Sequence, residues 1–427
     1  MTKQRGCRTP VRRLRALSIV LLASISMAAS APSAVAARLS LEDALRRAIA
    51  ADFALPAEEA KMLAAAAGVR QAGRRVNPSI GVDLGNFAGS GAFRGFNSNE
   101  TTVFLQQLLE MGGKRAARVG VAEAEAETAR ARAAVRILDL LRDVQVAWIE
   151  ALAATAQVRV IEERLTIARQ LQTEIARRAQ AGRDPAFAES RAKAQLALEQ
   201  IALERARSAA QTARAVVASY WRGSPNFDLD LHAFEHTPAI PQSLAHSADV
   251  ALLQAETEAA NARIGLERSR AYQDPTVRLG VRHLAERDDV AVVAGVSIPL
   301  GVFDTNRDNI DRAYAERSAA EFDLENARRI LVRETGRLES RRAATAIEAR
   351  RIRAEVLPQA KRAVQLIREG FDRGGFNYTD FSEAQRALNE VELRRIEALK
   401  AFHLEDAALA RLTGRHTKLQ VLRKSSR

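Results

Sequence analysis

The residues of this chain that could hold a metal ion or a phosphate are few and scattered. Of its six histidines, only His232 and His236 stand four positions apart, and they fall in a proline-containing segment that we interpret as a linker rather than a helix. A chance pairing is therefore favoured over a pair of metal ligands. The stretch "GGK" at 112–114 does not complete the GxxxxGK(S/T) pattern of a phosphate-binding loop. No nucleophile, base and orienting group form a recognisable set, so the sequence predicts no enzyme, no bound metal and no cofactor.

The N-terminus has the organisation of a secretory signal peptide. Six basic residues between positions 3 and 15 precede the apolar run 16–29, and small residues follow at 34–36. Cleavage is expected after Ala36, which would remove residues 1–36. The apolar run is too short to span a bilayer comfortably, and this disfavours the alternative of a membrane anchor.

Removal of this segment changes the charge and the cysteine content of the chain. The formal net charge falls from +13 to +7, because the segment carries six basic residues and no acidic one. The remaining arginines alternate with glutamates, as in "EAEAETARARAAVR", which is typical of a solvated helix face rather than of nucleic-acid binding. Cys7 is the only cysteine, so the mature chain has neither a disulfide nor a thiol ligand.

Four short segments have the alternation of apolar and polar residues that is typical of β-strands. We expect one hairpin with strands at about 79–87 and 101–109, and a second hairpin within 274–301. Successive strand side chains point to opposite faces, so each hairpin has one apolar face. The apolar positions are Ile80, Val82, Leu84, Val277, Leu279, Val281, Val292 and Val296. The opposite face carries Asp83, Arg278 and Arg282.

The same order of elements occurs twice along the chain. Asn77-Pro78 precedes the first hairpin and Asp274-Pro275 the second, and "GGKRAARVGVAEAE" (112–125) matches "TNRDNIDRAYAERS" (305–318). Each unit has roughly 200 residues, as in proteins built from internal repeats. The predicted parts are a first repeat at 37–223, a linker or equatorial segment at 224–244, a second repeat at 245–414 and a basic C-terminal tail at 415–427.

Each repeat is predicted as a helix, a hairpin, a long helix, a tight turn and a further helix. In the first repeat Ser40 caps a helix that runs to about Arg75, a long helix follows at about 112–181, and the turn "GRDP" leads to a helix at about 186–221. The long helix would measure roughly 105 Å, which equals the two shorter helices placed end to end. The repeat is therefore an elongated pillar with its strands at one end and its turn at the other.

The strands, rather than a helix, are expected to enter a membrane. No stretch after residue 37 holds about 18 consecutive apolar residues, whereas the alternating strands suit an outer-membrane barrel. A soluble sheet is the alternative, but helices that lead away from the hairpins would leave its apolar face uncovered. Four strands cannot close, so several chains must contribute. Two chains would fill the lumen with side chains and three would leave a channel, and Arg278 and Arg282 favour three.

The chain resembles the TolC-like outer membrane efflux proteins over its whole mature length. The resemblance rests on the twofold repeat, "NPS" (77–79), "LLEMGGKRAAR" (108–118), "IPLGVFDTNRDNIDRA" (298–313) and "GGFNYTDFSEAQRAL" (374–388). It implies a mainly α fold with a β-barrel part, in which a homotrimer forms a twelve-stranded barrel in the outer membrane and a long α-helical barrel in the periplasm. "EMGGKR" and "GVFDTNR" are most similar to the subgroup that serves heavy-metal efflux pumps of the resistance-nodulation-division (RND) type, the cobalt–zinc–cadmium class.

The resemblance also implies partners and the sites that contact them. The turns at the helix tips would contact a periplasmic adaptor protein, which connects the duct to an inner-membrane RND pump. These tip positions are Gly182, Arg183, Gly374, Gly375 and Phe376. Asp380 and Glu383 stand where the family places acidic residues, and three chains would set six carboxylates around one entrance, where they would favour cations. A solvated first helical turn is the alternative interpretation of both residues.

The expected function is that of a passive exit duct, placed in the outer membrane and extending into the periplasm. Its expected cargo is divalent heavy-metal cations. A duct for drugs or for type I protein secretion is one alternative, and a soluble periplasmic coiled-coil scaffold is another. The chain lacks the lipidated cysteine of many relatives, so the barrel alone, in contact with outer-membrane lipid, would anchor it.

Overall fold

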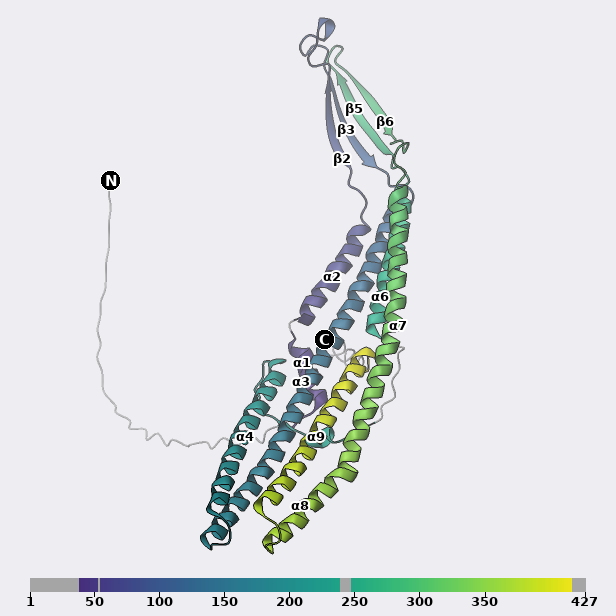
Figure 1. The fold of residues 1–427 in the computed structure, drawn as a ribbon. Coiled ribbons are helices and arrows are strands. Elements are labelled where there is room, and N and C mark those ends of the chain that lie inside the picture. The colour runs from purple at the N-terminus through teal and green to yellow at the C-terminus, as the bar shows by residue number, and fades with distance from the viewer. Residues whose placement is uncertain (1–37, 53, 239–246, 417–427) are drawn as a thin grey trace, which may run out of the picture. The chain divides into compact units, whose positions relative to one another are not determined.

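The computed structural model describes residues 38–52, 54–238 and 247–416. The predicted signal peptide with its cleavage site after Ala36, Cys7, residues 239–244 of the predicted linker and the tail beyond His416 lie outside the described residues. The described residues belong to one compact unit, Arg38–Arg427. In this unit a four-stranded sheet lies at one end, and long helices lead from it to two tight helix-to-helix turns at the other end (Figure 1).

The first repeat follows the predicted order. It contains α1 (Leu41–Ala51), α2 (Ala54–Ala72), β2 (Ser79–Gly85), β3 (Glu100–Leu108), α3 (Lys114–Gln180) and α4 (Ala186–Ser219). The long helix α3 has 67 residues. Ser40 caps α1 as predicted, because its side chain accepts a hydrogen bond from the Asp43 amide.

The prediction of one helix from Ser40 to Arg75 is wrong, because two helices occupy that segment. Asp52 ends α1 with an extended backbone, φ −69° and ψ 127°. Pro56, in the first turn of α2, has no amide hydrogen, and in a continuous helix its ring would collide with the Asp52 carbonyl. The proline therefore suits a new helix start and disfavours continuation.

The second repeat has the same order with one irregularity. It contains α6 (Ala248–Arg270), β5 (Thr276–Leu284), β6 (Asp289–Ser297), α7 (Arg307–Arg351), α8 (Leu357–Asp372) and α9 (Tyr378–Leu412). A π-helical turn, Ile352–Val356, joins α7 to α8 in one long helical run. Pro358 lies in the first turn of α8 and cannot donate the usual helical hydrogen bond, so a wider turn before it relieves the clash.

The two hairpins form one sheet in the order β2-β3-β5-β6, and all neighbouring strands are antiparallel. Ile80 pairs with Leu105, Leu105 with Leu279, and Leu279 with Ala294. Residues that pair across a sheet point to the same face. The register therefore joins the apolar faces of the two hairpins into one surface.

The main hydrophobic core joins α1, α3 and α9. Leu45 of α1, Val144 and Trp148 of α3 and Leu399 of α9 belong to this core and are buried. Among the described helices, α3 is the one with a window long and apolar enough to cross a membrane, but 44% of that window is buried inside the fold. That burial is typical of a core helix.

The segment predicted as a linker is folded in its described part. There β4 (Asp228–Leu229) pairs in parallel with β1 (Arg38–Leu39). The side chain of Asp230 caps the short helix α5 (Leu231–Phe234) by accepting from the His232 amide. Phe227 and Phe234 are buried in the main core, so the segment packs against the helices and does not form a free tether.

The placement of His232 outside a helix was also wrong. His232 lies in α5, and its ring stacks on that of His236 with 5.0 Å between the ring centroids. The Nδ1 atom of His236 lies 2.8 Å from the His232 carbonyl oxygen. In residues 38–52, 54–238 and 247–416, no group of three or more His, Cys, Asp or Glu side chains could hold a metal ion.

Candidate channel and docking surfaces

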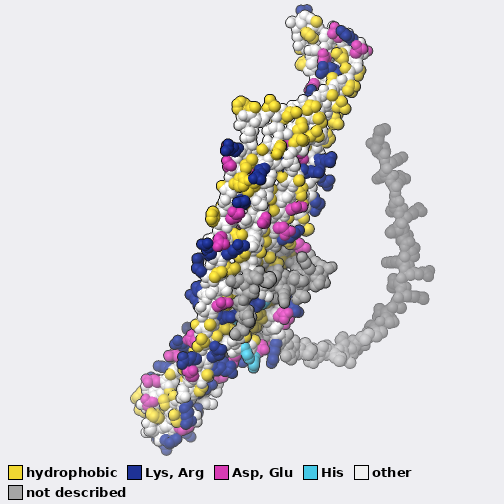
Figure 2. All heavy atoms as spheres, turned by 90° about the vertical axis from the view of Figure 1, so that its right-hand side faces the viewer, with side chains coloured by type: hydrophobic (Ala, Val, Ile, Leu, Met, Phe, Trp, Pro, Cys, Tyr) yellow, Lys and Arg dark blue, Asp and Glu magenta, His cyan; other side chains and the backbone are white. Residues whose placement is uncertain are grey.

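One face of the sheet is apolar and exposed to its surroundings. Ile80, Leu279 and Val292 lie on this face with 77%, 62% and 75% of their surface exposed. The other predicted apolar positions share the face: Val82, Leu84, Val277, Val281 and Val296. Figure 2 shows hydrophobic side chains gathered at this end of the unit. A contiguous exposed apolar surface is a contact site for lipid or protein.

The opposite face of the sheet carries paired charges. Arg278 contacts Asp83 at 3.1 Å between Nη1 and Oδ2, and Arg282 contacts Glu100 at 2.9 Å between Nη1 and Oε2. The Nε atom of Arg282 also donates to the Thr102 hydroxyl at 3.0 Å. Both pairs join strands of the first hairpin to β5 of the second. The three residues predicted for the polar face thus lie together on it.

Phe104 lies at the centre of the polar face, and the sequence pattern did not single it out. Its ring is buried against Gly81 of β2 and Gly280 of β5, its partners in the register. A Cβ atom at Gly81 would lie 2.4 Å from the Phe104 ring, and one at Gly280 would lie 2.7 Å from the Phe104 Cβ. The Arg278 guanidinium covers the ring at 4.6 Å from its centroid. In the sequence, the two glycines within strands were the signal that could have indicated a closely packed neighbour.

Both edges of the sheet are open in the described part of the chain. There β2 pairs only with β3, and β6 pairs only with β5. An edge strand presents unpaired N–H and C=O groups, and hydrocarbon leaves no water to satisfy them. A sheet with this apolar face therefore needs a further strand at each edge if it is to lie in a membrane.

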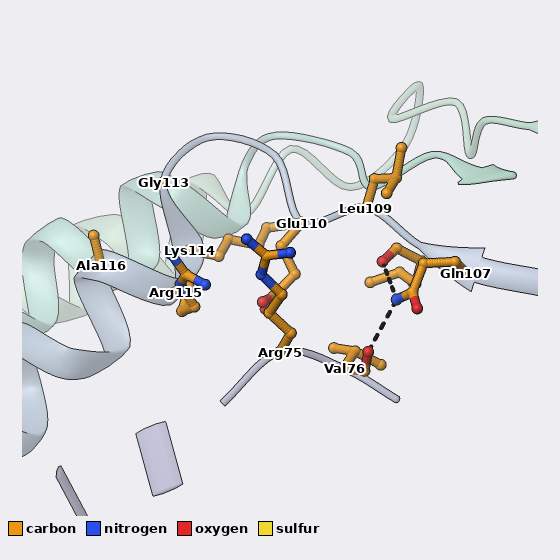
Figure 3. Close-up of a pocket in the computed structure, with 10 residues that line it drawn as sticks. Arg75, Val76, Gln107, Leu109, Glu110, Gly113, Lys114, Arg115 and Ala116 are labelled. Atoms are coloured by element: carbon orange, nitrogen blue, oxygen red, sulfur yellow. Dashed lines mark hydrogen bonds between the residues drawn. The ribbon is translucent and has the colours of Figure 1, made fainter. Parts of the chain in front are cut away.

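Residues of the "EMGGKR" motif lie where the sheet joins the helices (Figure 3). The Lys114 ammonium lies 2.6 Å from the Asp274 carboxylate and donates to the Tyr272 carbonyl at 2.6 Å. Asp274 also accepts from the Met111 amide at 2.8 Å. The motif of the first repeat thus binds the segment before β5 of the second repeat, and it holds the two hairpins against the helical bundle.

The junction carboxylates are held in their charged form. Burial alone would raise the pKa of Asp274, but the Lys114 ammonium and the Met111 amide outweigh it, and the pKa lies below its ordinary value. The hydrogen bond from Arg118 likewise lowers the pKa of Glu110. A carboxylate whose pKa is lower in the folded chain than in the unfolded chain stabilises the fold at pH values above the unfolded-state pKa. This stabilisation is lost as the pH falls through the folded-state pKa.

We expect Lys114→Met to lower the melting temperature of the detergent-solubilised protein, and we expect the difference from wild type to shrink below about pH 4. Loss of a hydrogen bond to a partly buried charge costs about 1.5 to 3 kcal/mol. Melting curves at pH 7, 5 and 3.5 measure this difference in melting temperature. Arg130→Met is the control, because Arg130 pairs with Glu127 on an exposed helix face. Equal effects of both variants at pH 7 would contradict the role of the junction.

The two tips at the other end of the unit are tight turns built on glycine. Gly182 and Gly374 have φ of 70° and 83°, values that favour glycine. No atom of the described residues lies within 4 Å of where a side chain at either position would begin, so both turns face outward. Arg183, Gly375 and Phe376 are exposed beside them. Phe187 at the first tip is 71% exposed, and no pattern in the sequence had singled it out.

The tips of the two repeats are joined by aromatic and arginine contacts. The Arg178 guanidinium lies over the Phe371 ring at 4.3 Å, donates to the Phe371 carbonyl at 3.0 Å and contacts Asp184 at 2.8 Å. Phe371 is buried with Ile175 and Tyr378. The two exposed turns are therefore presented by one packed unit.

The two predicted entrance acids have different surroundings. Asp380 belongs to a capping box at the start of α9, in which its Oδ2 atom accepts from the Asn377 amide at 2.9 Å and the Asn377 side chain accepts from the Asp380 amide at 3.1 Å. Glu383 is exposed, and it takes no part in the ion pairs found among the described residues. A capping role for Asp380 agrees with the alternative of a helical first turn.

Comparison with known proteins decides the family. Residues 44–221 and 239–415 each match the family described as "Outer membrane efflux protein". The chain belongs to this family. The cobalt-zinc-cadmium resistance protein CzcC of Cupriavidus metallidurans is 29% identical over 397 residues, which cover 91% of this chain and 93% of CzcC. The nickel and cobalt resistance protein CnrC of the same organism is 28% identical over 66% of this chain and 69% of its own.

Solved structures share the fold. The outer membrane protein VceC of Vibrio cholerae superposes with a TM-score of 0.72 at 18% identity, over 88% of this chain and 96% of VceC. The MtrE outer membrane channel of Neisseria gonorrhoeae superposes with a TM-score of 0.69 at 17% identity, over 88% of each chain. The predicted TolC-like fold, mainly α with a duplicated unit and a β part, is confirmed.

Family membership also confirms what kind of protein this is. The outer membrane efflux proteins are channel proteins rather than enzymes, and they lie in the outer membrane. The expectation of an outer-membrane efflux duct is therefore correct for this chain. The exposed apolar face of the sheet, the charged opposite face and the two packed tips are the surfaces with which such a duct would contact its surroundings.

Proposed function

We propose that three copies of this chain form one exit duct of a tripartite efflux pump. The observation that carries the proposal is the sheet, which has four strands, an exposed apolar face, a charged face and two open edges. Three such sheets joined edge to edge give a twelve-stranded barrel with room for a channel, whereas two would leave a lumen filled by side chains. Arg278, Asp83, Arg282 and Glu100 would line the lumen.

In this arrangement the two faces of the sheet meet different solvents. The eight apolar residues of the exposed face, from Ile80 to Val296, would contact outer-membrane lipid, as alternation in barrel strands requires. The charged residues of the other face would meet water in the lumen. The ion pairs across the strands reduce the cost of placing four charges per chain there and keep the lumen close to neutral at this depth.

The tips are the proposed contact with a periplasmic adaptor and, through it, with an inner-membrane RND pump. Gly182 and Gly374 place the turns so that Arg183, Gly375 and Phe376 lie outermost and exposed. Exposed aromatic and arginine side chains are enriched in protein interfaces. Phe187 adds a second exposed aromatic ring to the same end of the unit.

The proposed cargo is divalent heavy-metal cations. Support comes from the relatives, which are named for resistance to cobalt, zinc and cadmium and to nickel and cobalt. A strain that lacks the gene is expected to lose tolerance of one or more of these metals and to regain it from the wild-type gene on a plasmid. Unchanged metal tolerance together with increased drug sensitivity would contradict this cargo and favour the duct for drugs.

Asp380 and Glu383 are proposed to surround the entrance formed by three chains. We expect the double variant Asp380→Asn with Glu383→Gln to reduce the preference for cations over anions, because it removes six carboxylates from one opening. The reversal potential in planar bilayers with a salt gradient measures the preference, at low salt where screening is weakest. An asparagine at 380 retains an oxygen that can accept from the Asn377 amide, so the cap is kept.

The single variants separate the two residues. Glu383→Gln alone should carry the larger share of the effect, because Glu383 is exposed, whereas Asp380 is half-buried within its own helix cap. A double variant with wild-type selectivity would assign both acids to the solvated first turn of α9. Glu390→Gln is a suitable control, since Glu390 is exposed on the same helix two turns further on.

A further inference from the structure

The loop between β6 and α7 exposes apolar side chains that nothing in the described chain covers. Leu300, Val302 and Phe303 have 80%, 71% and 100% of their surface exposed. Asp304 follows them, and its Oδ1 atom accepts from the Asn306 amide at 2.8 Å, which fixes the end of the loop. A fully exposed phenylalanine within an apolar cluster marks a contact with another molecule. We call residues 300–304 the β6 loop.

A cavity lies beside the opposite edge of the same sheet (Figure 3). It has a volume of about 470 Å³ and lies between Arg75 and Val76, which precede β2, and the turn that follows β3. Val76 and Leu109 line it and are 43% and 42% exposed. Arg75 and Arg115 also line it, and neither takes part in the ion pairs found among the described residues.

Pairing of adjacent copies edge to edge would bring the loop of one copy and the cavity of the next together. In the register, Ser297 at the end of β6 pairs with Thr276, and Ser79 at the start of β2 pairs with Gln106, so both lie at the helical end of the sheet. An antiparallel pair between β6 of one copy and β2 of the next continues the alternation of the sheet. The β6 loop of one copy then lies directly beside Val76 of its neighbour.

We propose that the β6 loop docks into the cavity beside β2 of the adjacent copy, with Phe303 against Val76 and Leu109 and with Asp304 facing Arg75 or Arg115. The inference rests on the proposed function, because it requires adjacent copies in one barrel. The chemistry matches on both sides: an exposed apolar ring meets an apolar wall, and a carboxylate meets arginines that take no part in the ion pairs found among the described residues. The contact closes the barrel seam where strand pairing ends and helix packing begins.

Crosslinking tests this contact. In a Cys7→Ser background, Val76→Cys with Phe303→Cys is treated in outer-membrane fractions with a short bifunctional thiol reagent and run on denaturing gels. We expect covalent dimers and trimers, because each bond joins two chains, and none from either single variant. The control pair is Val76→Cys with Phe322→Cys, since Phe322 is also exposed, at 75%, but lies several turns along α7. This pair should not crosslink.

The thermal stability of the oligomer tests the same contact without a crosslink. Phe303→Ala should lower the temperature at which the native oligomer dissociates, whereas Phe96→Ala should not, because the exposed Phe96 lies in the loop at the other end of the strands. If the double variant formed a normal trimer without crosslinks, and if a membrane-soluble maleimide modified the Phe303→Cys variant, the loop would contact lipid and the docking would be overturned. A wild-type protein that is not a trimer would overturn the proposed function itself.

Discussion

Arginine in place of Leu279 is expected to prevent the chain from assembling in the outer membrane. Leu279 lies in the middle of β5, is 62% exposed and pairs with Leu105 and Ala294 on the apolar face. A charge on the lipid side near the bilayer midplane costs about 2 to 4 kcal/mol per chain, and the proposed trimer would incur it three times. The amount of protein that enters outer-membrane fractions and resists dissociation on unheated gels measures assembly.

The control for this variant lies at the same depth on the other face. Val293 is next to Ala294, the partner of Leu279, and it pairs with Gly280, so it lies on the polar face of the sheet. Val293→Arg should therefore assemble nearly as well as wild type, because its charge would meet water in the lumen. If Leu279→Arg assembled normally while Val293→Arg failed, the lipid face and the lumen face would be the reverse of those proposed.

Replacement of either tip glycine by tryptophan is expected to abolish the metal resistance of the cell, while the barrel still assembles. Gly182 and Gly374 have positive φ and face open space, so a tryptophan there strains the turn and projects from the surface proposed to meet the adaptor. We expect Gly374→Trp to eliminate copurification with the adaptor and to lower metal tolerance to that of the deletion strain. Pull-down from crosslinked cells and growth on metal-containing plates measure the two effects.

A smaller substitution at the same position separates strain from bulk. Gly374→Ala carries the same backbone strain, about 1 kcal/mol, but adds only a methyl group. It should retain most adaptor binding if docking is blocked by the indole. Equal loss in both variants would assign the effect to a distorted turn, and unchanged binding in Gly374→Trp would remove this tip from the docking surface.

Much of the architecture could be predicted because its signals are periodic or repeated. Strand alternation placed β2, β3, β5 and β6 within a few residues, and the two copies of the pattern supported each other. The shared apolar face was also within reach, since both hairpins carry one apolar face and a slip of one residue would put the two faces on opposite sides of the sheet. The length of α3 followed from an uninterrupted helical pattern that ends at Gly182.

The features that were missed depend on contacts between residues far apart in the chain. The contact of Arg178 with Phe371 joins the two tips, and neither residue shows a local pattern that points to the other. Phe104 occupies space left by glycines on two other strands, which becomes visible only once the register is known. The break between α1 and α2 is the exception, because Pro56 is a local signal of a new helix start.

The "EMGGKR" motif has a structural role that its sequence does not indicate. In the sequence it served to relate the chain to a subgroup of efflux proteins. In the structure Lys114 binds Asp274 across the two repeats, so the motif holds the repeats together where the strands meet the helices. A lysine has no preferred partner that spacing alone could reveal, and the partner lies in the other copy of the repeat.

The mass of the purified protein in detergent tests the central claim most directly. Light scattering with subtraction of the bound detergent should give three times the mass of one mature chain, because a single four-stranded sheet has two open edges that close only between copies. The same sample should precipitate or aggregate when the detergent is removed. A stable, monodisperse monomer in detergent-free buffer would contradict the account and favour a soluble periplasmic scaffold.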